Sequence, residues 1–249
     1  MTRLPGARAR NALLLTSAML LAWQGLFMIA GEHALTSPLS TMASAARLLL
    51  DPGFHPHLLE TTQAFVVALA IAVALGFLIG FSLGLHRLAN EVAEPVLIAL
   101  YSIPKITLYP IVLLAFGIGI SARIAFGAMH GIVPIAIFTM GAVRNLNPVY
   151  VKTARMLRLS AFDTVRRILL PGALPEIFTG LRIGFSLTLI GTLLGEMFAS
   201  KRGIGHLLMT AIGLHNVQRI TAITLLLILF AVGASAVLLR IDRKLHRRL

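Results

Sequence analysis

Long stretches without charge dominate this sequence and limit the folds that it can adopt. The 21 residues between Arg10 and Glu32, and the 26 residues between Glu60 and Arg87, contain no Asp, Glu, Lys or Arg. Folded as a helix, either stretch can cross the roughly 30 Å hydrocarbon core of a membrane. The mean hydropathy is +0.89 and only 12% of the residues are charged. A soluble surface needs about a quarter of its residues charged, so the chain is expected in a membrane.

Four further segments complete a set of six predicted membrane-spanning helices. Two stretches of 20 uncharged residues follow Arg123 and Arg219. Two more, 95–119 and 175–199, are apolar apart from four charged residues, namely Lys105, Glu176, Arg182 and Glu196. The sequence therefore predicts an all-α integral membrane protein with about six transmembrane helices. The first span follows a basic cluster, as a signal peptide would, but its apolar run exceeds the usual length of about 7–15 residues. We therefore expect a retained helix.

Basic residues are unevenly distributed between the two sides of these spans. With the N-terminus inside, the inner segments hold 15 Lys and Arg residues and the outer segments hold five. Since cytoplasmic loops are enriched in Lys and Arg, we expect both termini and the segment 144–175 in the cytoplasm. A sequence pI of about 11.6 would suggest nucleic acid binding in a soluble protein. On so apolar a chain it indicates loops that face anionic lipid, and we expect no nucleic acid partner.

Glycines and prolines predict how the spans pack. Gly76, Gly80 and Gly84 recur every four residues, which favours close contact between helices. Later spans contain pairs with the same spacing, namely Gly127/Gly131, Gly180/Gly184 and Gly191/Gly195. Prolines predict kinks or breaks in the third and fourth spans, at Pro104, Pro110 and Pro134. In the outer segment, Ser37 and Pro38 predict the start of a short amphipathic helix at the membrane surface.

The segment from Val151 to Pro171, VKTARMLRLSAFDTVRRILLP, is strongly basic for so apolar a chain. A helix is predicted to start at Asn147–Pro148 and to end near Leu157. A second amphipathic run is predicted from Asp163 to Leu170, with Pro171 helping to end it. A basic and apolar helix pair of this kind can lie on lipid or dock into a groove of another protein, and the periodicity does not choose between them.

Three stretches of the chain resemble a known family of membrane proteins. The first matches the spacing Glu-Ala-Ala, three residues, Gly, nine residues, Ile-x-Leu-Pro, at Lys152, Thr153, Ala154, Arg158, Ile168, Leu170 and Pro171. The others are YSIPKITLYPIVLLAFGIG upstream and LPGALPEIFTGLRIGFSLTLIGTLLGEMFASKRGIGHLL downstream. Together they resemble the transmembrane permease subunits of binding-protein-dependent ABC importers, in the nitrate, sulfonate and taurine branch. The resemblance covers about 58–239.

The resemblance implies a type I ABC importer permease fold in three parts. Residues 1–57 would form an N-terminal transmembrane helix and outer amphipathic segment, 58–240 the permease core and 241–249 a basic cytoplasmic tail. The loop 144–175 would carry the coupling helix that seats in a cleft of a cytoplasmic ATPase. Its expected coupling residues are Lys152, Thr153, Ala154, Leu157, Arg158, Ser160, Ile168 and Pro171. The family has an acid where this chain has Lys152 and glycine where it has Arg158. These departures are compatible with an ATPase cleft of different charge, with a weakly coupled subunit, or with one half of a heterodimer.

The resemblance also implies partners and a solute class. The expected partners are two ATPase subunits that use ATP and Mg, a second permease copy or relative, and a periplasmic or lipid-anchored solute-binding protein. The location would be a bacterial inner membrane and the solute a small anion such as nitrate, a sulfonate or taurine, although the branch also includes permeases for neutral or cationic heterocycles. The chain has no G-x-x-x-x-G-K-[ST] motif, so it is expected to bind no cofactor and to catalyse no hydrolysis itself.

Charged residues inside the spans are candidates for the translocation path, since such residues are costly in a membrane. Lys105 beside Pro104 can attract an anion, or it can snorkel or bond freed carbonyls. For Arg182 we expect a structural bond, and Glu196 falls near the outer end of its span.

An ion- or proton-coupled secondary transporter is the alternative function, and a membrane-embedded enzyme is a third. A secondary transporter needs titratable groups near the membrane midplane, and a membrane-embedded enzyme needs a converging set of catalytic residues. The sequence indicates neither. The remaining candidates for metal ligands, His55, His57 and Glu60, are interpreted as an ordinary polar loop.

Overall fold

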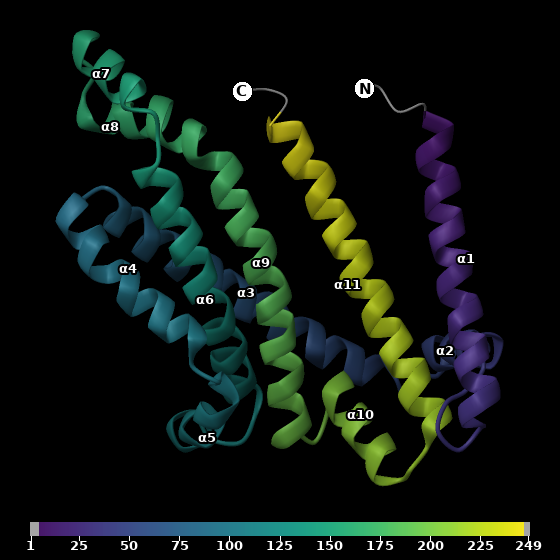
Figure 1. The fold of residues 1–249 in the computed structure, drawn as a ribbon. Coiled ribbons are helices and arrows are strands. Elements are labelled where there is room, and N and C mark those ends of the chain that lie inside the picture. The colour runs from purple at the N-terminus through teal and green to yellow at the C-terminus, as the bar shows by residue number, and fades with distance from the viewer. Residues whose placement is uncertain (1–4, 247–249) are drawn as a thin grey trace. The chain divides into compact units, whose positions relative to one another are not determined.

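The computed structural model describes residues 5–246, and every regular element in this part of the chain is a helix (Figure 1). Arg3, Arg247 and Arg248, which contribute to the predicted charge asymmetry, lie outside the described residues. The helices are α1 (Pro5–Ala30), α2 (Pro38–Leu50), α3 (His55–Gly84), α4 (Arg87–Ser102), η1 (Lys105–Leu108), α5 (Tyr109–Phe116), α6 (Ile120–Arg144), α7 (Pro148–Met156), α8 (Ala161–Thr164), η2 (Val165–Leu169), α9 (Leu170–Phe198), α10 (Ile204–Gly213) and α11 (Val217–His246).

Five helical stretches are long and apolar enough to cross a membrane, namely Arg10–Ala30, His55–Gly84, Ile120–Arg144, Ala161–Phe198 and Val217–Ile241. A sixth candidate is the bent pair formed by Arg87–Ser102 and Lys105–Phe116, which turns by 84° at its break. Five of the six predicted spans therefore correspond to helices long enough to cross a membrane, and the third corresponds to the bent pair. The bend occurs at Pro104, because proline cannot donate the next hydrogen bond of α4.

The described chain forms two compact units. Among the described residues, the first unit comprises 5–56 and 207–230, and the second comprises 57–206 and 231–246. In the first unit, the side chain of Ser37 accepts a hydrogen bond from the backbone N–H of Ser40 at 3.3 Å, and Pro38 opens α2. The predicted start of this helix is confirmed. The hydroxyl of Thr36 lies 2.6 Å from that of Thr221, which ties the segment before α2 to α11.

Glycines bring the helices of the second unit into close contact. A Cβ atom at Gly76 of α3 would lie 2.7 Å from the Cβ of Ile135 on α6. A Cβ at Gly180 of α9 would lie 2.5 Å from the Cβ of Phe138, again on α6. Helices α6 and α9 accordingly run side by side (Figure 1). Helix faces lined by glycine allow close van der Waals packing, and the predicted close contact between helices is confirmed for α3, α6 and α9.

Two other prolines lie within continuous helix. Pro134 is fully buried in α6, which runs unbroken from Ile120 to Arg144. Neighbouring helices make such a proline tolerable in a membrane bundle. The prediction that Pro171 helps to end a helix is wrong, because helix continues from Ala161 to Phe198. Residues 165–169 form a π turn in which the N–H of Leu170 donates to the carbonyl of Val165, and this wider turn carries the helix into the proline.

Candidate functional site

The first candidate site is the α7–α8 segment, residues 148–170, which lies at one end of the second unit (Figure 1). Ala154 is buried, whereas the side chains of Met156 and Leu157 are 84% and 64% exposed. Other large apolar side chains exposed on this segment are Val149, Tyr150 and Phe162. An apolar group this exposed on a short helix can be covered by lipid or by another protein.

The turn between α7 and α8 contains a left-handed residue. Arg158 has φ of +49°, the conformation for which glycine is preferred. The N–H of Leu159 donates to the carbonyl of Ala154 at 3.1 Å, a hydrogen bond typical of a helix that ends in a left-handed residue. The next helix starts at Ser160, whose hydroxyl accepts from the N–H of Asp163 at 3.1 Å. Two capping interactions therefore define this turn.

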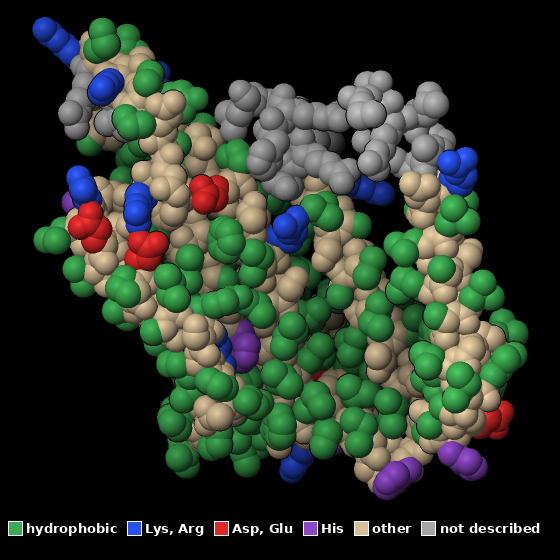
Figure 2. Space-filling model, viewed as in Figure 1, with side chains coloured by type: hydrophobic (Ala, Val, Ile, Leu, Met, Phe, Trp, Pro, Cys, Tyr) green, Lys and Arg blue, Asp and Glu red, His purple; other side chains and the backbone are tan. Residues whose placement is uncertain are grey.

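Charge surrounds the exposed apolar groups of the α7–α8 segment. Lys152, Arg158, Arg166 and Arg167 are exposed, and Arg167 also pairs with Asp163 at 3.0 Å. Figure 2 shows Lys and Arg side chains gathered at this end, while hydrophobic side chains cover most of the helices of the unit. The remaining predicted coupling residues include exposed Thr153 and half-buried Ile168 and Pro171.

The second candidate site is the Glu196 cluster, formed by Thr61, Arg123, Glu196 and the N-terminal turn of α10. The Glu196 carboxylate is completely buried. It accepts hydrogen bonds from the Thr61 hydroxyl at 2.8 and 2.9 Å and from the N–H of Gly205 at 2.9 Å. The N–H of Ile204 in turn donates to the Thr61 hydroxyl oxygen at 2.8 Å. The cluster thus joins the start of α3, the end of α9 and the start of α10.

Arg123 pairs with Glu196 of this cluster and with the neighbouring acid Glu60. One of its guanidinium nitrogens lies 2.6 Å from the Glu60 carboxylate and another lies 3.7 Å from that of Glu196. We predicted Arg123 in a segment between spans, but the structure places it inside α6 with its side chain 4% exposed. Burial of Arg123 depends on acids far away in the sequence, Glu60 and Glu196, and the charge spacing alone does not indicate it.

The third candidate site is a cavity of about 330 Å³ in the second unit. Its lining residues are Tyr101, Arg182, Ile183, Ser186, Leu187, Ser235 and Leu239, from α4, α9 and α11. The Lys105 ammonium lies outside this lining, but it donates to the Tyr101 carbonyl at 3.1 Å and lies 5.2 Å from the centroid of the Tyr101 ring. Of the predicted path residues, Arg182 therefore lines this cavity and Lys105 contacts Tyr101 of its lining. Pro104 forms the bend beside them, whereas Glu196 belongs to the buried cluster.

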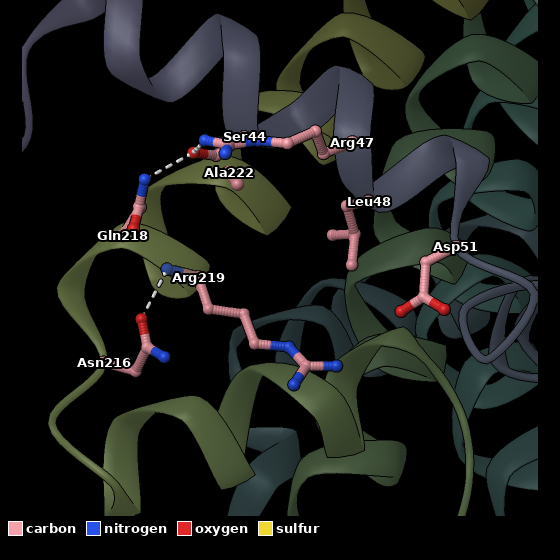
Figure 3. Close-up of a pocket in the computed structure, with 8 residues that line it drawn as sticks. All are labelled: Ser44, Arg47, Leu48, Asp51, Asn216, Gln218, Arg219 and Ala222. Atoms are coloured by element: carbon pink, nitrogen blue, oxygen red, sulfur yellow. Dashed lines mark hydrogen bonds between the residues drawn. The ribbon is translucent and has the colours of Figure 1, made fainter.

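A fourth feature is a pocket of about 310 Å³ in the first unit, where α2 lies against the start of α11 (Figure 3). The Ser44 hydroxyl oxygen accepts from Gln218 at 2.8 Å and from Arg47 at 3.3 Å. The side chain of Arg219 also lines the pocket. Two guanidinium groups and one carboxylate, Asp51, give this pocket a positive balance.

The interpretation of His55, His57 and Glu60 as a polar loop is wrong, because these residues form the first turns of α3 and make protein contacts there. The His57 Nδ1 atom accepts from the N–H of Gly203 at 3.1 Å, and Glu60 pairs with Arg123. Within the first unit, the Nε2 atom of His55 lies 2.9 Å from the carbonyl oxygen of Leu49. Among the described residues, no group of three or more His, Cys, Asp or Glu side chains converges on a possible metal site.

Comparison with solved structures relates this fold to ABC importer subunits. A chain of the methionine ABC transporter MetNI, solved in inward-facing conformations, matches with a TM-score of 0.67 and 20% identity, over 76% of this chain and 94% of that one. A chain of an amino acid ABC transporter solved with histidines matches with a TM-score of 0.59 and 16% identity, over 86% of this chain and 100% of that one. At these identities the likeness concerns the fold.

Comparison with known sequences identifies relatives among permeases. The taurine transport system permease protein TauC of Escherichia coli K12 is 27% identical over 65% of this chain and 59% of its own length. The aliphatic sulfonates permease protein SsuC of the same strain is 34% identical over 51% of this chain and 48% of its own. The nitrate import permease NrtB of Leptolyngbya laminosa is 28% identical over 76% of this chain and 70% of its own length. The matched region thus spans about half to three fifths of the length of the first two relatives.

A family model described as the inner membrane component of binding-protein-dependent transport systems matches residues 72–249. This range includes the bent span, the α7–α8 segment and the Glu196 carboxylate. It covers well over half of the chain and agrees with the fold and with the related sequences. The chain therefore belongs to the family of inner membrane components of binding-protein-dependent transport systems.

Proposed function

We propose that this chain is the membrane subunit of an ATP-driven importer and that it forms the path for a small anionic solute. ATP and Mg are used by a separate ATPase, and two such subunits act with two permease chains. A periplasmic or lipid-anchored solute-binding protein delivers the solute. The names of the relatives, which include taurine, sulfonate and nitrate permeases, support the solute class.

The observation that carries the proposal is the α7–α8 segment. It presents the exposed apolar side chains of Met156 and Leu157 beside exposed cations, while Ala154 is buried. Such a surface fits a groove of another protein that offers an apolar floor and an acidic rim. In this proposal the groove belongs to the ATPase, and the segment lies in the cytoplasm together with both termini.

The arrangement of helix behind the segment supports its role in transmission. Helix runs without interruption from Ala161, beside the docking surface, to Phe198, beside buried Glu196. A rigid helix can carry a displacement from one end to the other, whereas a flexible loop would dissipate it. Closure of the ATPase would thereby reach the opposite end of the bundle.

Reconstitution tests the proposal. The permease is co-expressed with a candidate ATPase and a candidate solute-binding protein from the same genome, and the complex is purified through a tag on the permease and placed in proteoliposomes. We expect ATP-dependent uptake of labelled taurine, ethanesulfonate or nitrate. Uptake by the permease without ATP would favour an ion-coupled transporter instead, and uptake of none of these anions with intact ATPase coupling would reject the anionic solute.

A further inference from the structure

We infer that the cavity lined by Arg182, Tyr101 and Ser235 is a subsite for the anionic group of the solute, a sulfonate or another small oxoanion. The inference rests on the proposed function, because it assumes that the transported solute is an anion. The cavity lies within one unit of the chain, between helices that are long enough to span a membrane or belong to the bent pair. Its volume of about 330 Å³ suits a ligand of a few non-hydrogen atoms.

Arg182 is the strongest indication of an anion. Its side chain is half-buried, and its guanidinium makes no hydrogen bond or ion pair with any of the residues that the structure describes. An arginine side chain cannot lose its proton in a protein, so the charge remains. An unpaired charge surrounded by apolar helices is costly, and intramembrane charges generally have a functional partner. None of the seven lining residues is an acid, so the partner must come from outside this lining.

Hydroxyl groups in the same cavity can supply the remaining hydrogen bonds. The Ser235 and Tyr101 hydroxyls make no hydrogen bond within the described part of the chain, and both residues line the cavity. The Ser186 hydroxyl donates to the backbone carbonyl of Arg182 at 3.3 Å. The planar guanidinium can bind two oxygens of a sulfonate or nitrate at once, and a hydroxyl can donate to a third.

Lys105 adds a second positive charge close to this cavity. Its ammonium lies 5.2 Å from the centroid of the Tyr101 ring, and Tyr101 is itself part of the lining. One cation in the lining and another next to it attract anions and repel cations. An anionic lipid headgroup shares this chemistry with a solute anion, so the test has to distinguish the two sources.

The absence of cysteine from the sequence provides a direct probe of the cavity. Ser235→Cys introduces one thiol, and the complex in phosphatidylcholine nanodiscs is treated with 2-sulfonatoethyl methanethiosulfonate or with its trimethylammonio counterpart. The mass of the intact permease chain reports the reaction. Each rate is divided by the rate of the same reagent with a free thiol. We expect the anionic reagent to be favoured about tenfold, and taurine, ethanesulfonate or nitrate to slow it.

Variants at Arg182 show whether this preference comes from the cavity. Arg182→Gln in the Ser235→Cys background should remove the preference, and Arg182→Lys, which keeps the charge, should retain most of it. Ser82→Cys, at an exposed position of α3, is the matched control and should show the same rates with and without Arg182→Gln. Equal reactivity of both reagents at Ser235→Cys, with Arg182 present, would overturn the subsite.

Binding of an anionic lipid headgroup in the cavity, instead of the solute, predicts a different result. If the three solutes leave the anionic reagent's rate unchanged and replacement of phosphatidylcholine by phosphatidylglycerol slows it, the cavity holds a headgroup and the solute subsite is rejected. The proposed function is tested in a separate experiment, which measures uptake by the unaltered complex. A complex that transports none of these anions but shows the charge preference would reject both the anionic solute and the solute subsite. A complex that transports one of them without the charge preference would reject the subsite alone.

Discussion

Arg158 holds a conformation that costs a side chain free energy. Its φ of +49° is accessible to glycine without strain and costs another residue about 1 kcal/mol or more. The exposed guanidinium can offset this cost through a charge-assisted bond to an acidic rim of the ATPase. We therefore expect Arg158→Glu to weaken assembly with the ATPase and to lower transport per ATP, and Arg158→Gly to be milder. Co-purification and the ratio of uptake to hydrolysis measure both effects. An Arg158→Glu complex with unchanged subunit ratio and unchanged coupling would assign this side chain to lipid headgroups.

Glu196 is the buried acid on which the second candidate site depends. Removing its carboxylate leaves the Gly205 N–H without its acceptor and Arg123 without one of its partners. We expect Glu196→Ala to lower the stability of the folded subunit by about 1–3 kcal/mol, because the buried Gly205 N–H loses its acceptor while Arg123 keeps its pair with Glu60. Thermal denaturation in detergent measures the loss. Glu91→Gln, which breaks an exposed pair with Arg87, is the control and should cost far less. Equal losses for the two variants would contradict a stabilising role of the buried network.

At the scale of elements, contact between α3 and α6 depends on glycine. A Cβ at Gly80 would collide with the backbone carbonyl of Ala136, which cannot move without its helix. We expect Gly80→Ala to destabilise the subunit by about 1–3 kcal/mol through overpacking. Gly233→Ala on α11 has nothing within 4 Å of the added Cβ and should be neutral or stabilising. Thermal denaturation of both variants tests this, and tolerance of alanine at both positions would show that the helices separate readily.

The whole molecule is proposed to lie with both termini in the cytoplasm. Lys201, between α9 and α10, and Met156, at the end of α7, are both exposed and lie in segments predicted on opposite sides. In intact cells we expect a membrane-impermeant maleimide to label Lys201→Cys, and to label Met156→Cys only after permeabilisation. The native chain, which has no cysteine, provides the blank. The reverse labelling pattern would invert the topology and exclude ATPase docking at the α7–α8 segment.

The six spans, the start of α2 and the turn after α7 could be predicted from local sequence. A span needs only an uncharged run as long as the hydrocarbon is thick, and a cap needs only a few adjacent residues. The glycine spacing also predicted close packing, because helical periodicity places residues four apart on one face. The helix partners of those faces were not predictable, since α3 and α9 each had several possible neighbours.

Only the tertiary structure determined the surroundings of Arg123, Pro171 and Arg182. Arg123 is buried because Glu60 and Glu196, from two other helices, supply the opposing charges. Pro171 continues a helix because a π turn precedes it, and Arg182 lines a cavity because α4 and α11 lie beside α9. Sequence by itself determined which segments are helical and apolar, since hydropathy and helix periodicity are properties of neighbouring residues. The location of each charge depended on helices distant in sequence, because only their packing determines which charges are paired, buried or left facing a cavity.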